Sequence, residues 1–194
     1  MHAFLVATGL VALAEIGDKT QLLALVLAAR FRRPWPIVAG ILLATLANHG
    51  LAGGVGRWAG AFLGTYLDPD WVRWGLAAGF IAMAAWTLMP DKLDEDDAPK
   101  GRRRAGAFLT TLVSFFLVEI GDKTQVATIG LAAQYPDLVA IVAGTTLGML
   151  IANVPVVFLG PKLLKKVPLA LVRYAAALAF LLLGLSLFMG WVGV

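Results

Sequence analysis

The sequence predicts an all-α membrane protein that spans the bilayer six times, as two inverted three-helix repeats. Three observations lead to this fold class: a strongly apolar composition, six apolar segments separated by polar connections, and a seven-residue motif that occurs twice. Of the 194 residues, 60% are hydrophobic and 14% are charged, and the mean hydropathy is +0.83. Because a soluble domain is only about 45 to 50% apolar, this composition places the chain in a lipid bilayer.

Six segments are apolar and long enough to cross about 30 Å of hydrocarbon. Prolines, tryptophans and charged residues separate them, as is typical of membrane interfaces. The polar stretch 91–104, with acidic residues followed by basic ones, is expected to be a charged cytoplasmic linker between a first repeat, 1–90, and a second, 105–194. The expected spans are approximately 3–29, 37–63, 71–89, 105–133, 138–159 and 169–192.

The first span has an alternative interpretation as a signal peptide, because Ala12-Leu13-Ala14 resembles a peptidase site. The chain start lacks lysine and arginine, and the equivalent apolar stretch before Glu119 lies in the middle of the chain. We therefore expect a membrane helix at 3–29.

An internal repeat relates the two halves. The motif Glu-Ile-Gly-Asp-Lys-Thr-Gln occupies residues 15–21 and again 119–125. At the same offset of 104 residues, Ile-Val-Ala-Gly at 37–40 recurs at 141–144, and with one extra residue Asn48 corresponds to Asn153. Because three helices is an odd number, the second repeat enters the membrane in the opposite sense. The two motifs are therefore expected to meet near the membrane midplane.

The basic residues predict the orientation. Of 16 lysines and arginines, 12 fall on one side of the predicted membrane, Arg57 and Arg73 fall on the other, and two belong to the motifs. The positive-inside rule places the 12 in the cytoplasm and both termini outside. This topology also accounts for the net charge of +4, so we expect no nucleic-acid partner.

Each motif places two carboxylates and an ammonium group within an apolar segment. On a continuous helix, Asp18 would lie about 60° to one side of Glu15 and Lys19 about 40° to the other. A charge at the centre of a membrane helix costs about 2.5 to 3.5 kcal/mol, so six such charges indicate a site. The predicted cation-binding residues are Glu15, Asp18, Glu119 and Asp122, with supporting roles for Gln21, Gln125, Asn48, Asn153, Lys19, Lys123, Thr20 and Thr124.

Four carboxylates together offer up to eight oxygens, which suits a hard divalent cation. Calcium takes six to eight oxygen ligands and manganese accepts carboxylates, whereas zinc and copper usually recruit histidine or cysteine, and the chain has no cysteine. His49 is the single candidate nitrogen ligand, but its repeat counterpart is Val154, so we interpret it as a local hydrogen-bonding residue. Without metal, such a cluster should hold protons, since desolvation and mutual repulsion favour the neutral carboxyl groups. Competition between metal and protons is the minimum requirement for antiport.

Two details of the motif stay open at this level. Lys19 and Lys123 are either counter-charges that move away when a cation binds or members of structural ion pairs. Gly17 and Gly121 either let the helix unwind or let a neighbouring helix pack closely.

The two copies of Glu-x-Gly-Asp-Lys-Thr, each opening a three-helix unit, resemble a family that includes the Golgi manganese/calcium transporters of animals and yeast (Gdt-one type, uncharacterised protein family sixteen) and bacterial manganese exporters. The resemblance covers the whole chain. It implies secondary transport of Mn²⁺ or Ca²⁺ in exchange for protons, with these ions as substrates and no cofactor. The compact linker and short start resemble the bacterial branch, which implies export across the bacterial plasma (inner) membrane, by a monomer or a homo-oligomer.

Three other functions could use buried acids of this kind. A passive divalent cation channel would use the same acids. An intramembrane aspartyl protease would also have two buried aspartates, but its Gly-x-Gly-Asp and Pro-Ala-Leu patterns are absent. An organic-solute exporter would need an apolar complement to its substrate, which the motifs do not provide. We therefore expect a transporter and not an enzyme.

Overall fold

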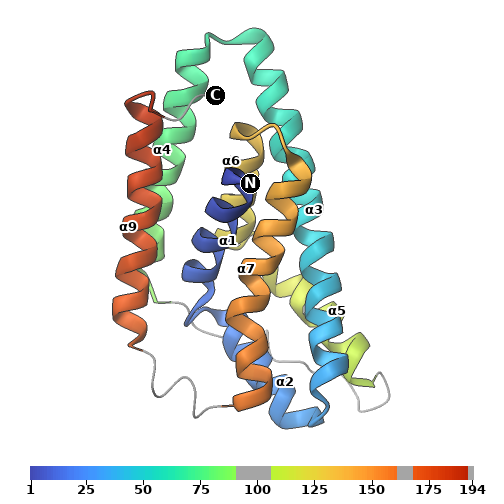
Figure 1. The fold of residues 1–194 in the computed structure, drawn as a ribbon. Helices are drawn as coiled ribbons and strands as arrows, with labels where there is room; N and C mark the ends of the chain where they lie inside the picture. Colours follow the sequence, from blue (N-terminus) through green and yellow to red (C-terminus); the bar gives the residue numbers. More distant parts are fainter. Residues whose placement is uncertain (91–105, 161–167, 192–194) are drawn as a thin grey trace.

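The computed structural model describes residues 1–90, 106–160 and 168–191, and in these residues the secondary structure is entirely helical (Figure 1). The predicted linker 91–104 lies outside them. The described helices are α1 (His2–Glu15), α2 (Lys19–Phe31), α3 (Pro34–Tyr66), α4 (Pro69–Thr87), α5 (Gly106–Glu119), α6 (Lys123–Gln134), α7 (Leu138–Leu159) and α9 (Leu169–Phe188).

Two of the predicted spans, 3–29 and 105–133, each consist of two helices and not of one continuous helix. The first consists of α1 and α2, and the second of α5 and α6. Both breaks fall inside the repeated motif. Gly17 and Gly121 have φ angles of +86° and +77°, a left-handed conformation that glycine adopts readily and that ends a right-handed helix. Unwinding of the helix is observed at both glycines, and Gly17 is also closely packed, because a Cβ atom on it would lie 3.1 Å from the Leu169 side chain of α9.

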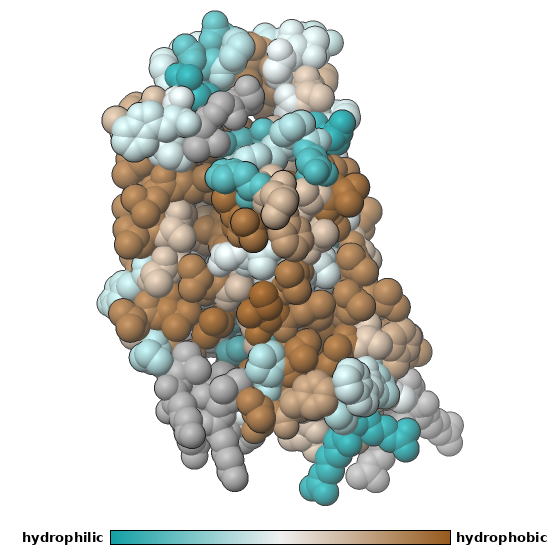
Figure 2. All heavy atoms as spheres, viewed as in Figure 1, coloured by the Kyte–Doolittle hydropathy of each residue, from teal (hydrophilic) through white to brown (hydrophobic). Residues whose placement is uncertain are grey.

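Three of the described helices, α3, α7 and α9, are long and apolar enough to cross a membrane, and α1 and α5 are shorter apolar helices. Apolar side chains cover the middle of the visible face, whereas polar side chains gather towards its two ends (Figure 2). This banding is expected of a protein surrounded by lipid between two aqueous phases. The chain is an all-helical integral membrane protein.

Close approaches at glycine join the two halves of the chain. A Cβ atom on Gly40 would lie 2.9 Å from the carbonyl oxygen of Phe108, so α3 and α5 touch backbone to backbone. A Cβ atom on Gly144 would lie 2.6 Å from the carbonyl oxygen of Phe4, so α7 and α1 do the same. Both glycines and both phenylalanines are 104 residues apart. The α3–α5 and α7–α1 interfaces therefore use equivalent residues and the small-residue packing common in membranes.

We expect Gly121→Ala to lower the free energy of unfolding by about 1 to 2 kcal/mol, because the left-handed conformation is unfavourable for alanine. The new methyl group itself has room, since nothing lies within 4 Å of it. Gly64→Ala is the matched control: it also has open space but an ordinary helical backbone, so it should leave stability unchanged or raise it by up to about 1 kcal/mol. Thermal unfolding in detergent measures both. Equal stability of the two variants would contradict the role assigned to the Gly121 conformation.

Candidate cation site

The motif forms a short loop between two half-helices. α1 ends at Glu15, and Asp18 is the residue before α2, with φ −80° and ψ 167°. Asp122 has nearly the same conformation before α6, with φ −76° and ψ 160°. Glutamate and aspartate therefore flank a break in the helix, and the predicted sharing of one continuous helical face is wrong.

The motif glutamines close these loops. The side-chain oxygen of Gln21 accepts a hydrogen bond from the backbone N–H of Gly17 at 2.9 Å, and Gln125 accepts one from Gly121 at 2.8 Å. Both loops are thus fixed by the same local contact. Since these oxygens are already bonded within the loop, the glutamines support the site from its edge.

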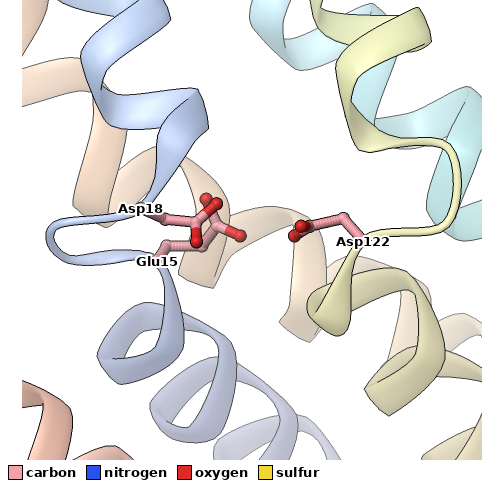
Figure 3. A group of neighbouring side chains, drawn as sticks. All are labelled: Glu15, Asp18 and Asp122. Carbon is pink, nitrogen blue, oxygen red and sulfur yellow. The ribbon is translucent and has the colours of Figure 1, made fainter. Parts of the chain in front are cut away.

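Three of the four predicted carboxylates converge. Glu15, Asp18 and Asp122 each have an oxygen within 4.8 Å of the others, and the residues are at most 3% exposed. The three side chains point towards one another from two separate helix breaks (Figure 3). Two motifs 104 residues apart therefore meet inside the protein, as the repeat predicts.

The fourth carboxylate, Glu119, lies beside this cluster and is bonded to α3. Its Oε1 accepts a hydrogen bond from Thr45 at 3.2 Å, and its Oε2 accepts one from the Asn48 amide at 3.1 Å. Glu119 is fully buried and close enough to Glu15 for their charges to repel each other. Sequence reasoning missed Thr45, whose only signal is its position one helical turn before Asn48.

The motif lysines pair across the two halves. The Nζ of Lys19 lies 3.3 Å from Oδ1 of Asp122, and the Nζ of Lys123 lies 2.8 Å from Oδ1 of Asp18. The Lys123 side chain is 4% exposed and the Lys19 side chain 22%. Each half therefore supplies the counter-charge for the aspartate of the other half.

The threonines and the second asparagine complete the polar surroundings. Thr20 donates a hydrogen bond to Oε2 of Glu15, and Thr124 donates one to Asp122 at 3.3 Å. The amide of Asn153 instead donates to the Met149 carbonyl of its own helix at 3.0 Å. Asn48 and Asn153, although equivalent in the repeat, thus have different partners.

His49 does not act as predicted. It is fully buried, yet neither ring nitrogen has a hydrogen-bond partner among the described residues. The expected local hydrogen bond of His49 is therefore not observed among the described residues.

A small polar cavity of about 10 Å³ adjoins Asp18 and Lys123. Thr87 and Arg173, from α4 and α9, border the same cavity. This volume holds about one water molecule. Sequence reasoning assigned Arg173 only to membrane topology and did not connect it with the motifs.

The fold and the site define an integral membrane protein that encloses a cluster of carboxylates suited to a cation. Residues 3–95 and 107–193 match the family described as divalent cation/proton antiporter GDT1. The chain belongs to this family of transporters. Because the family consists of antiporters and not enzymes, the alternative of an intramembrane aspartyl protease is wrong.

Several relatives align with most of the chain. A Vibrio cholerae protein named "Putative manganese exporter" is 50% identical over 187 residues, which is 96% of this chain and 90% of the relative. A GDT1-like protein of Synechocystis is 28% identical over 79% of this chain and 81% of its own length. The GDT1-like protein 5 of Arabidopsis thaliana is 27% identical over 96% and 95%. No solved structure matches the chain.

We expect Lys123→Gln to destabilise the protein more than Lys19→Gln. Breaking a buried ion pair costs about 3 to 5 kcal/mol because it leaves a buried charge poorly compensated, whereas a partly exposed pair contributes about 0 to 1 kcal/mol. The exposures of 4% and 22% place Lys123 nearer the first case. Thermal unfolding of both variants in detergent gives the comparison. If Lys19→Gln proved the more damaging, the ranking of the two pairs by burial would be incorrect.

Proposed function

We propose that this protein exports divalent cations, Mn²⁺ above all, in exchange for protons, and that Glu15, Asp18, Asp122 and the adjacent Glu119 bind the cation. The observation that carries the proposal is the convergence of three buried carboxylates within 4.8 Å of one another. A buried group of carboxylates needs a positive partner, since both desolvation and repulsion oppose its charge. The name of the 50% identical relative supports Mn²⁺ as the preferred ion.

The oxygen-rich donor set supports a hard ion over a soft one. Carboxylate and hydroxyl oxygens surround the cluster, and these ligands suit Mn²⁺ and Ca²⁺ better than zinc or copper. The helix ends at the breaks do not add to this preference, because the C-terminal ends of α1 and α5 and the N-terminal ends of α2 and α6 meet there with opposite partial charges.

The formal charges suggest a stoichiometry. Four carboxylates and two ammonium groups carry a formal charge of −2, which either one divalent cation or two protons would neutralise. Leaving this charge uncompensated inside the membrane is unfavourable in both states. We therefore propose that two protons return for each ion exported, so that the exchange moves no net charge.

We propose a six-span arrangement in which α1 with α2, and α5 with α6, each form one interrupted span. The equivalent contacts of Gly40 with Phe108 and of Gly144 with Phe4 support two inverted repeats. Broken helices that meet at the centre of inverted repeats are a recurring design of secondary transporters. In this arrangement each motif contributes half of the site.

The orientation follows from the arginines. Arg30, Arg32 and Arg33 are exposed at the connection between α2 and α3, whereas Arg57 lies much further along α3. We propose that the α2–α3 end faces the cytoplasm of a bacterial cell, with both termini outside the inner membrane. Ions would then leave the cytoplasm from the end that carries the three arginines.

The cation site is tested with Asp18→Asn and Asp122→Asn in reconstituted vesicles. We expect each to reduce Mn²⁺-driven proton movement by more than about 100-fold, because second-shell changes alone cost 10- to 100-fold at metal sites and these residues lie in the cluster itself. Asp70→Asn is the matched control, since Asp70 is exposed and paired with Arg73 away from the motifs. Full exchange by both motif variants would refute the site. Mn²⁺ flux that neither moves protons nor responds to a pH gradient would instead indicate a passive channel.

The stoichiometry is tested by imposing a membrane potential on the same vesicles. We expect the equilibrium Mn²⁺ gradient to be independent of the potential, because two protons balance one divalent ion. With one proton per ion, one net charge would cross, and 100 mV would change the gradient by about 50-fold. The ratio of protons to Mn²⁺ measured from simultaneous fluxes provides the second check.

A further inference from the structure

The two motifs are identical in sequence, but their glutamates have different partners. Both oxygens of Glu119 accept hydrogen bonds from α3, one from Thr45 and one from Asn48. Glu15 lies instead in the carboxylate cluster and accepts a hydrogen bond from Thr20. Its second oxygen, Oε1, is fully buried with no partner at good hydrogen-bonding geometry among the described residues, and Thr124 of the other motif is the nearby hydroxyl that interacts with the Glu15 carboxylate. One glutamate is therefore held outside the cluster while the other occupies it.

Asn153 is the residue that could hold Glu15 as Asn48 holds Glu119. It is the repeat counterpart of Asn48 and is fully buried. Its Oδ1 has no partner within the described part of the chain, and its amide donates only to Met149, on the same helix. A buried amide oxygen without a partner is unfavourable, so Asn153 is not in its most favourable hydrogen-bonding arrangement here.

The glutamines show the same difference between the halves. The Gln125 amide donates to Oδ1 of Asn48 at 3.4 Å, which ties the second motif to α3. The Gln21 amide donates to the carbonyl of Ala152 at 2.8 Å, one residue before Asn153. The first motif thus already lies next to Asn153 without being bonded to its side chain.

The sequence explains why the two helices differ. Met149 stands 104 residues after Thr45 but, because of the one extra residue, four residues before Asn153 and not three. A thioether there replaces the hydroxyl that holds Glu119. A thioether donates no hydrogen bond, and here its sulfur lies 3.1 Å from the Asn153 amide. α3 therefore offers a glutamate two donors, whereas α7 offers one donor that is already occupied.

We infer that Glu15 and Glu119 exchange places during transport, and that Asn153 is the positioning residue that receives Glu15 when Asn48 releases Glu119. In the second arrangement, Glu119 joins Asp18 and Asp122 in the cluster, and Glu15 accepts a hydrogen bond from the Asn153 amide. Each glutamate is then a cation ligand in one of the two arrangements, so three of the four proposed carboxylates converge on the cation at a time. The inference rests on the proposed function for its purpose, but its geometry rests on the two glutamates alone.

The exchange gives the protein two discrete states whose balance can be shifted. Removing Asn48 or adding a donor at Met149 favours the second arrangement, and removing Asn153 opposes it. Met149→Thr and Asn153→Ala each involve about one net hydrogen bond, so we expect each to change the ratio of the two states by about three- to tenfold. Asn48→Ala removes hydrogen bonds to Glu119, Phe116 and Gln125, so its effect should be at least as large.

The test uses a cysteine at Thr87, which borders the cavity beside Asp18, in a chain that has no cysteine of its own. Thr87 is buried in the described arrangement, so the rate at which a small thiol reagent modifies Thr87→Cys in vesicles reports how often the site leaves this arrangement. We expect Asn48→Ala and Met149→Thr to shift this rate in the same direction, and Asn153→Ala to reverse the shift when added to Asn48→Ala. Thr146→Ala is the control. Thr146 is also buried on α7, and its hydroxyl has no partner among the described residues, so adding Thr146→Ala to Asn48→Ala should leave the shifted rate unchanged.

The inference is overturned if Asn153→Ala leaves the shift of Asn48→Ala in place, or if Met149→Thr shifts the rate in the opposite direction or not at all. Met149→Thr adds an interaction, so it remains informative if Asn48→Ala does not fold. Failure of the proposed function is seen separately, as the absence of Mn²⁺/proton exchange by the unsubstituted protein, because the thiol rates do not depend on which ion is carried.

Discussion

The cost of placing charge inside a membrane governs this structure. Each motif brings two acids and a lysine into an apolar segment, and none of these charges is stable there alone. The structure compensates them across the two halves, through Lys19 with Asp122 and Lys123 with Asp18. Because the partners come from opposite motifs, neither half can bury its charges without the other. The central cluster therefore joins the two halves as well as forming the proposed cation site.

The loops at Gly17 and Gly121 follow from the same constraint. On a continuous helix the acidic side chains would compete for one narrow face, whereas a break turns them towards the opposite motif. The break also leaves backbone groups unpaired in the membrane, which is acceptable only where protein satisfies them. The side-chain oxygens of Gln21 and Gln125 satisfy part of this requirement, because each accepts a hydrogen bond from the N–H group of the glycine in its loop. Glutamate, glycine, aspartate and glutamine thus act together in the motif.

Much of this arrangement could be predicted from the sequence, because repetition and hydropathy both carry long-range information. The repeat offset predicted that Asp18 and Asp122 would meet, and the apolar composition predicted an integral membrane protein. The helix breaks were one of two possibilities, since a glycine such as Gly17 is compatible with unwinding as well as with close packing of a continuous helix. The position of Glu119 beside the cluster could not be predicted. It depends on a hydrogen bond from Thr45, which lies outside the motif and is replaced by a methionine, Met149, in the other half. Contacts between polar residues that are distant in the sequence depend on how the helices pack against one another. The hydropathy of the sequence gives no information on that packing.

This last difference shows where function departs from symmetry. Two identical halves would hold their glutamates equally, and neither arrangement would be preferred. Thr45 on α3 corresponds to Met149 on α7 in the repeat, so α3 is the stronger hydrogen-bonding partner for a glutamate. Accordingly, Glu119 is bonded to α3 and Glu15 lies in the cluster. A difference of about one net hydrogen bond is small enough for ion or proton binding to overcome. A site made of two near-equivalent halves can therefore rest in one state and still reach the other, which a perfectly fixed cluster of carboxylates could not do.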